Sequence, residues 1–134
     1  MRPEFVSPPS LYAAAPYEYA AIAPAGARLV FAAGACPLND AGEVAPPGDY
    51  EAQARAALEN LSVALEAAGS GFEHVLKSTV YVASSDRAQL VRVWNVVEKS
   101  FAPAMPPSTL LGVAGLGYAG QLVEIEAVGF ARET

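Results

Sequence analysis

Two segments of this chain repeat apolar residues at helical spacing, and they limit the possible folds more than any other feature. The first pattern begins after Asp49, and Gly69 and Gly71 end it. Its apolar members are Ala54, Ala57, Leu58, Leu61 and Leu65. The second pattern of apolar residues lies in residues 86–101 and ends before Pro103. Its members are Leu90, Val93, Trp94, Val97 and Phe101. The sequence therefore predicts two long helices that begin at Asp49 and Asp86, with Trp94 in the core.

The other apolar segments are short and have the composition of β-strands. Residues 77–82 are rich in β-branched and aromatic side chains, and residues 108–113 alternate between the two faces of a strand. Residues 17–22 and 28–33 are separated by Ala-Pro-Ala-Gly, which predicts a β-hairpin near the start of the chain. With residues 121–130 as the last strand, the predicted order is β-β-α-β-α-β-β.

The length of the chain and its apolar content predict how these elements pack. A chain of 134 residues that is 53% hydrophobic and 16% charged can form one domain, residues 1–134, around a single core. Two helices can cover one face of a sheet of about five strands, so we expect an α+β fold with both helices on one face of a mixed sheet. The other face then has no partner within the chain, which favours a closed homo-oligomer.

The last predicted strand carries two acids within otherwise apolar sequence. The two-residue period of a strand places Glu124 and Glu126 on one face, and Val123 and Ile125 on the other. The Cα atoms of the two acids would lie roughly 7 Å apart, close enough for the charges to interact. The pair is either part of a functional site or a strand face that is open to solvent.

Charge and cysteine content narrow the functional classes. A net charge of -6, with no run of Lys or Arg, disfavours binding to nucleic acid or anionic lipid. No stretch approaches the roughly 20 apolar residues of a membrane span, and Pro16 and Glu18 interrupt the segment where a signal peptide would lie. One cysteine and one histidine cannot form an internal disulfide or a structural zinc site. We therefore expect a cytoplasmic protein with a small-molecule partner and no metal.

Six short motifs follow one another along nearly the whole chain. They are Ala15-Pro16-Tyr17, Ala33-Gly34-Ala35-Cys36-Pro37, Gln53-Ala-Arg-Ala-Ala-Leu58-Glu59-Asn60 with Ala67-Ala68-Gly69, Val75-Leu-Lys77-Ser-Thr-Val-Tyr-Val82, Pro106-Pro107-Ser108-Thr109 and Val123-Glu124-Ile125-Glu126-Ala127. In this order and at these spacings they resemble the Rid family, also called YjgF or L-PSP. The fold of that family is similar to bacterial chorismate mutase. The resemblance implies a homotrimer with ligand sites in the clefts between subunits.

The resemblance also implies a reaction and roles for particular residues. The best-known Rid members hydrolyse reactive imines and enamines to keto acids and ammonia, with no metal or bound cofactor. Glu124 aligns with their acidic residue beside the imine, a position that suits general acid–base catalysis. Tyr17 aligns with a tyrosine that lines the cleft, and we expect Gly34 and Cys36 to contact the ligand as well. The alternatives are simple packing for Tyr17, a small buried apolar role for Cys36 and a paired or solvated strand acid for Glu126.

One substrate-binding position departs from the family pattern. Deaminating members resemble Pro-Ala-Arg-Ser where this chain has residues 106–109, so Ser108 replaces the arginine that clamps the substrate carboxylate. A hydrogen bond to a charged group is worth roughly 1.5–3 kcal/mol, so the loss weakens binding of such a substrate about tenfold to a hundredfold or more. Ser108 is therefore either a strand-opening hydroxyl or the mark of a site for an uncharged ligand.

Residues 115–120 spell G-x-G-x-x-G directly after a predicted strand, which is the fingerprint of a dinucleotide site. Such a loop must open a helix whose N-terminus holds the pyrophosphate, whereas residues 121–130 alternate as a strand. The sequence therefore predicts a turn here and no bound nucleotide cofactor.

Three functional hypotheses remain open at this level, so the chain is not assigned as an enzyme. The first is a Rid-type imine or enamine deaminase, a hydrolase of C=N bonds, with an altered anchor at Ser108. The second is a non-catalytic trimer that binds a small molecule in the intersubunit cleft, as an accessory to a pathway. The third is an endoribonuclease or translation inhibitor, which the acidic charge disfavours.

Overall fold

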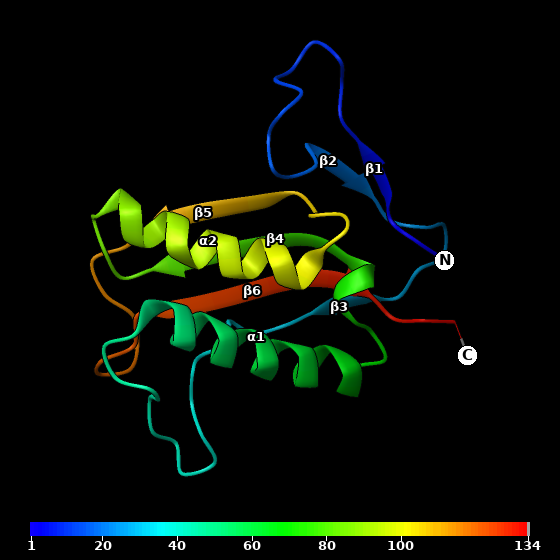
Figure 1. The fold of residues 1–134 in the computed structure, drawn as a ribbon. Coiled ribbons are helices and arrows are strands. Elements are labelled where there is room, and N and C mark those ends of the chain that lie inside the picture. Colours follow the sequence, from blue (N-terminus) through cyan, green and yellow to red (C-terminus); the bar gives the residue numbers. More distant parts are fainter. Residues whose placement is uncertain (134) are drawn as a thin grey trace.

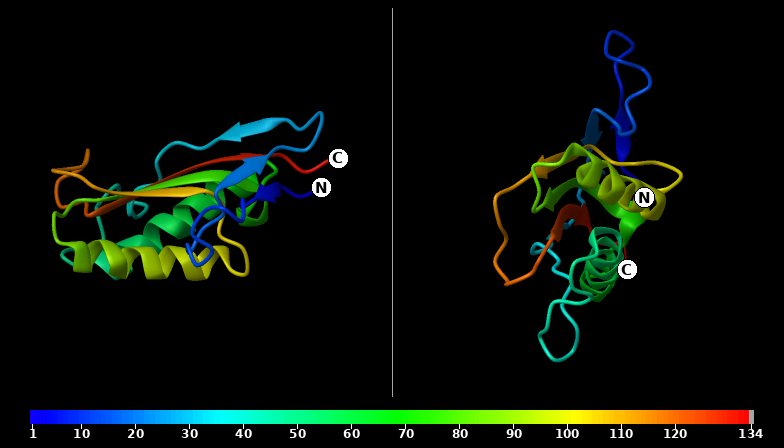
Figure 2. Two further views of the ribbon diagram at one scale, coloured as in Figure 1. Left: turned by 90° about the horizontal axis from the view of Figure 1, so that it is seen from above. Right: turned by 60° about the vertical axis from the view of Figure 1, so that its left-hand side comes forward.

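The computed structural model describes residues 1–133 and contains a four-stranded mixed sheet with two helices on one face (Figures 1 and 2). The strands lie in the order β3-β6-β4-β5, with bounds Leu29–Phe31, Val123–Phe130, Val75–Val82 and Ser108–Gly112. Strands β4 and β5 are parallel, whereas β6 is antiparallel to both of its neighbours. The helices α1 (Tyr50–Ala67) and α2 (Arg87–Phe101) contact each other and the sheet. The predicted α+β class, the mixed sheet and the placement of the helices are confirmed.

Both helices begin where the sequence predicts. Asp49 accepts a hydrogen bond from the backbone N–H of Ala52 at 3.0 Å, and Asp86 accepts one from Ala88 at 2.9 Å. Each aspartate satisfies a donor that the first helical turn leaves unpaired. Helix α1 ends just before Gly69, whose φ of +79° favours glycine and stops the helix.

The core lies between the helices and the sheet. The apolar side chains that the helical spacing selects are buried there, except that Leu90 is partly buried at its edge. Val123, Ile125 and Ala127 of β6 meet them, so the predicted alternation along this strand is confirmed. Trp94 is 9% exposed and lies in the core, as predicted. Residues 115–120 form a loop before β6, which agrees with the predicted turn.

The hairpin predicted between residues 17–22 and 28–33 is wrong. Strand β2 (Ala20–Ile22) pairs with β1 (Glu4–Val6), a strand that the sequence did not predict, while β3 pairs with β6. The turn itself is present, because the N–H of Ala27 donates to the carbonyl of Pro24 at 3.1 Å. A local turn does not determine the partners of the strands beside it, and β3 completes its hydrogen bonds with a strand from the end of the chain. The pair β1-β2 consequently stands apart from the main sheet (Figure 1).

The sheet face opposite the helices, here called the open face, includes Phe31, Tyr81, Leu111, Glu124 and Glu126. Phe31 is 72% exposed and Leu111 is 43% exposed, and Leu29 at the edge strand is 51% exposed. Clustered apolar exposure of this kind commonly marks an interaction surface. The unpartnered face that the sequence predicts is therefore present in the subunit. Within residues 1–133 no helix has both the length and the apolar composition needed to span a membrane.

Candidate functional site

Glu124 lies on the open face and is hydrogen-bonded through one carboxylate oxygen. Its Oε1 accepts from the thiol of Cys36 at 3.3 Å and from Nε2 of Gln121 at 3.1 Å. Cys36 reaches this position because Ala35 forms an antiparallel bridge with Ile125 of β6, with N to O distances of 2.7 and 3.1 Å. The chain segment after β3 thus brings its thiol beside the acid of the last strand.

Gly34 packs directly against the same carboxylate. A Cβ atom built on Gly34 would lie 2.2 Å from Oε2 and 2.7 Å from Cδ of Glu124. Any side chain at position 34 would therefore push the carboxylate aside. Glycine fits here because of this close approach and not because of its backbone conformation, since its φ is not in the left-handed region.

Cys36 acts as a hydrogen-bond donor in this cluster. Burial and the hydrogen bond to the Glu124 carboxylate raise the pKa of the Cys36 thiol to about 11. The thiol is therefore protonated at neutral pH and is a weak nucleophile. Nδ2 of Asn60 donates to the carbonyl oxygen of Cys36 at 2.8 Å and holds its backbone in place. The alternative of a purely apolar, buried cysteine is incorrect, because Cys36 is only half-buried and its thiol contacts a carboxylate.

The second acid of the strand has a different partner. Tyr81 of β4 donates its hydroxyl to Oε1 of Glu126 at 2.6 Å. This hydrogen bond, burial and the negative charge nearby raise the pKa of Tyr81. Among residues 1–133 no Lys, Arg or His forms an ion pair with Glu124 or Glu126. Both acids of the open face are thus hydrogen-bonded by uncharged groups.

Ser108 lies on the sheet face opposite Glu124. The strand register pairs Ser108 with Ser78, whose side chain is fully buried on the helix side. The two hydroxyls are hydrogen-bonded to each other, and Ser108 also donates to the carbonyl of Pro106 at 2.9 Å. Within one subunit Ser108 therefore acts as a strand-opening hydroxyl and does not reach Glu124.

Tyr17 packs beside α2 and is not brought next to Glu124 within the subunit. Its ring meets Trp94 edge-on, with ring centroids 6.2 Å apart. It also lines a hollow of about 810 Å³ between the N-terminal segment and the end of α2, together with Tyr12, Tyr19 and Lys99. Tyr17 thus combines the packing role with a position at the wall of a hollow.

Two polar residues on or near the open face were not singled out from the sequence. Gln121 is 3% exposed, and its Oε1 accepts from the N–H of Tyr118 at 3.2 Å while Nε2 donates to Val123 and Glu124. Lys77 lies opposite Val128 in the register and donates to the hydroxyl of Thr109 at 2.7 Å. Both residues lie at or near the start of a predicted strand, and no sequence signal separates them from ordinary polar strand positions.

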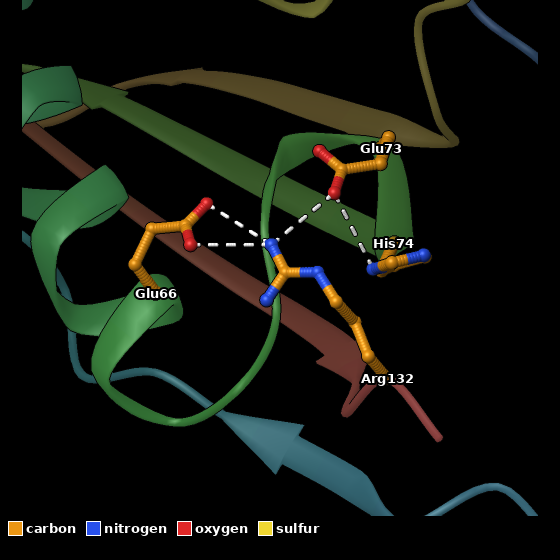
Figure 3. Close-up of polar contacts among 4 residues, drawn as sticks. All are labelled: Glu66, Glu73, His74 and Arg132. Atoms are coloured by element: carbon orange, nitrogen blue, oxygen red, sulfur yellow. Dashed lines mark hydrogen bonds and ion pairs between the residues drawn. The ribbon is translucent and has the colours of Figure 1, made fainter. Parts of the chain in front are cut away.

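Another group of acids lies where α1 ends and the chain terminates. Nη2 of Arg132 contacts both oxygens of Glu66, at 3.1 and 3.2 Å, and Oε1 of Glu73 at 3.5 Å (Figure 3). His74 Nδ1 lies 3.5 Å from the same Glu73 oxygen. These contacts fasten the end of the chain to α1. Throughout residues 1–133 no three His, Cys, Asp or Glu side chains are grouped so that they could hold a metal ion.

The fold and this geometry define a class: an α+β protein that presents a hydrogen-bonded carboxylate on an unpartnered sheet face. A family model described as Endoribonuclease L-PSP matches residues 8–131. The chain therefore belongs to the Rid family, also called YjgF or L-PSP, as its motifs predict.

Individual relatives cover most of the chain. Protein DfrA of Myxococcus xanthus is 34% identical over 113 residues, which are 84% of this chain and 83% of that protein. The 2-iminobutanoate/2-iminopropanoate deaminase of Bos taurus is 32% identical over 101 residues, 75% of this chain and 72% of the other. The solved structure of the Rid-family protein YyfB from Yersinia pestis superposes with a TM-score of 0.88 at 26% identity, covering 97% of this chain and 99% of YyfB. The fold is thus shared with YyfB over nearly its whole length.

Proposed function

We propose that this chain is a Rid-type deaminase that hydrolyses an imine or enamine to a carbonyl compound and ammonia. The observation that carries this proposal is the Glu124 carboxylate, which is partly exposed on the open face and has no cationic partner within residues 1–133. Relatives named 2-iminobutanoate/2-iminopropanoate deaminase, at 32% and 33% identity, support the reaction class.

Hydrolysis of a C=N bond needs a group that transfers protons. Water adds to the carbon of the C=N bond, and the nitrogen then leaves as ammonia while the C=O bond forms. A carboxylate beside the imine takes a proton from the attacking water and returns a proton to the leaving nitrogen. Glu124 has the chemistry for this role, and the missing side chain of Gly34 leaves room for its carboxylate.

The substrate anchor differs from that of the members that carry an arginine. The hydroxyl of Ser108 is engaged by Ser78 and Pro106 on the helix side of the sheet. A substrate that relies on a clamped carboxylate would therefore lose that contact in this chain. The favoured substrates are imines without the carboxylate, or imines whose carboxylate is bound by a cationic side chain of another subunit.

The functional unit is a homotrimer whose ligand sites lie in the clefts between subunits. The exposed apolar residues of the open face, Phe31 and Leu111 among them, support association. Gel filtration with light scattering should give three times the subunit mass of 13.9 kDa. A monomer at micromolar concentration would contradict this assembly.

Non-catalytic binding of a small molecule is the second candidate, and the position of Ser108 favours it. If the native ligand is not hydrolysed, it should still raise the melting temperature of the protein, because a ligand that binds only the folded state stabilises it. Cleavage of RNA has the least support, since a net charge of -6 opposes binding to phosphates.

The test is release of keto acid and ammonia from 2-aminoacrylate and 2-aminocrotonate generated enzymatically, together with imines that lack a carboxylate. The native chain should exceed the rate in buffer, and Glu124→Gln should lower turnover about a hundredfold, in the range of general acid–base catalysis. If no imine is hydrolysed faster than in buffer, the deaminase assignment fails and a thermal-shift ligand screen decides whether the binding role holds.

A further inference from the structure

Glu124 is bound by the protein through only one of its two oxygens. Oε1 accepts from both Cys36 and Gln121, whereas Oε2 has no hydrogen-bond partner among residues 1–133. In that part of the chain the buried side-chain polar atoms without a partner are Ser70 Oγ, His74 Nδ1 and Trp94 Nε1. Oε2 of Glu124 is not one of them, so this unpaired atom is not fully buried.

The two donors to Oε1 are themselves fixed. The Gln121 amide is oriented at both ends, because its oxygen accepts from Tyr118 N and its nitrogen donates to the carbonyl of Val123 at 3.1 Å. The backbone of Cys36 is held by the neighbouring bridge of Ala35 to β6 and by the hydrogen bond from Asn60. The Gln121 amide and the backbone of Cys36 are therefore held in place beside the carboxylate.

Gly34 restricts the carboxylate from the other side. Oε2 occupies the space where a Cβ atom of residue 34 would lie, and the carbonyl oxygen of Gly34, 3.5 Å from Sγ of Cys36, is a longer alternative acceptor for the single thiol proton. The carboxylate is thus held at Oε1 and confined at Oε2, which gives its two oxygens different roles.

We propose that Cys36 and Gln121 are positioning residues that hold Glu124 through Oε1 and so present Oε2 to the ligand. This inference rests on the proposed function, in which Glu124 acts on an imine, and it names Oε2 as the oxygen that exchanges protons with water and the leaving nitrogen. Cys36 contributes its S–H as a donor and forms no covalent bond with the substrate.

The contact itself can be measured without any substrate. Cys36 is the only cysteine, so the S–H stretching band in a Raman spectrum of the native protein belongs to it alone. The band should move to higher frequency in Glu124→Gln, because an amide oxygen is a weaker acceptor than a carboxylate. The matched control Glu126→Gln removes an acid that contacts Tyr81, and should leave the band in place. An unchanged band in Glu124→Gln would overturn the Cys36 contact.

The positioning role is then tested by kinetics. Cys36→Val and Gln121→Leu should each lower kcat about tenfold with KM changed less than twofold, since each loses one hydrogen bond to a charged acceptor. Cys36→Ser keeps a donor and should restore most of the native kcat. Melting temperatures of all variants separate these effects from unfolding. Native kcat in both Cys36→Val and Gln121→Leu would overturn the inference.

The two proposals fail in different ways. If Glu124→Gln abolishes turnover while the Cys36 and Gln121 variants keep it, the proposed reaction stands and the positioning role is wrong. If Glu124→Gln keeps native turnover, the proposed role of Glu124 is wrong, and the Raman band still decides whether Cys36 donates to it.

Discussion

Two pairs of acids in this protein are hydrogen-bonded in different ways. At the end of α1, Glu66 and Glu73 share the guanidinium of Arg132, with distances of 3.1 to 3.5 Å (Figure 3). On the open face, Glu124 is held by a thiol and an amide, and Glu126 by a phenol. The first group contains a cation among its contacts, whereas the second is bound by neutral donors alone.

This difference identifies the Arg132 group as a structural contact and the open-face group with Glu124 as the candidate site. An arginine compensates the charge of a carboxylate and leaves little for a ligand, while neutral donors orient a carboxylate without cancelling its charge. Ion pairs as exposed as those of Arg132 contribute at most about 1 kcal/mol to stability. The identity of the partners, and not the number of acids, therefore indicates which group is available for chemistry.

The largest effect on turnover should come from Gly34→Ala, which places a methyl group against the Glu124 carboxylate. The new methyl group would overlap Oε2 of Glu124, so we expect turnover to fall at least as far as in Glu124→Gln, about a hundredfold. The free energy of unfolding should fall by about 1–3 kcal/mol, as for other overpacked sites. Gly115→Ala is the matched control, because a Cβ there meets nothing within 4 Å. Native turnover in Gly34→Ala would contradict the claim that turnover depends on the position of the Glu124 carboxylate.

A second effect concerns the reactivity of Cys36 toward iodoacetamide. Removing the carboxylate in Glu124→Gln should lower the pKa of Cys36 from about 11 and raise the alkylation rate near pH 8.5 by about tenfold for each unit of pKa. Glu66→Gln, in the arginine-paired group, should react as the native protein does. Equal alkylation rates in the native protein, Glu124→Gln and Glu66→Gln would show that Glu124 influences the reactivity of Cys36 no more than Glu66 does.

The raised pKa of Cys36 also predicts how stability depends on pH. The folded state holds the thiol proton more tightly than the unfolded state, so this contribution is complete below about pH 9 and is lost as the pH rises through 11. The stability difference between the native protein and Cys36→Ser should therefore shrink between these pH values. Urea unfolding at several pH values measures it, and a difference that stays constant across this range would contradict the prediction.

The smallest effect is expected in the arginine-paired group. Arg132→Met should lower the free energy of unfolding by less than about 1 kcal/mol, because the side chains are largely exposed and solvent weakens the ion pairs. Its turnover should equal that of the native chain. A loss of turnover comparable to that of Glu124→Gln would remove the distinction between the two groups.

Much of the fold follows from local patterns. The helical spacing, the caps at Asp49 and Asp86 and the alternation along β6 were all readable from the sequence, because each depends on neighbouring residues. The pairing of the first strands could not be predicted from the sequence. Strand β3 pairs with β6, about a hundred residues away, and the turn at Pro24 carries no information about that partner.

The site could be predicted only in part for the same reason. The two-residue period placed Glu124 on one face, and the family motifs selected Gly34 and Cys36 near it. Gln121 was not singled out because the sequence predicts it as the first residue of the last strand, whereas that strand begins at Val123. The direction of Ser108 depends on its register with Ser78, a long-range feature that neither composition nor spacing reveals.

The most direct test of this account is imine hydrolysis by the native chain, Glu124→Gln and Glu66→Gln, measured in parallel with their melting temperatures. Glu124 is predicted to be the acid that acts on the ligand, so Glu124→Gln should lose turnover about a hundredfold while Glu66→Gln keeps it. Equal turnover in the two folded variants would contradict the account.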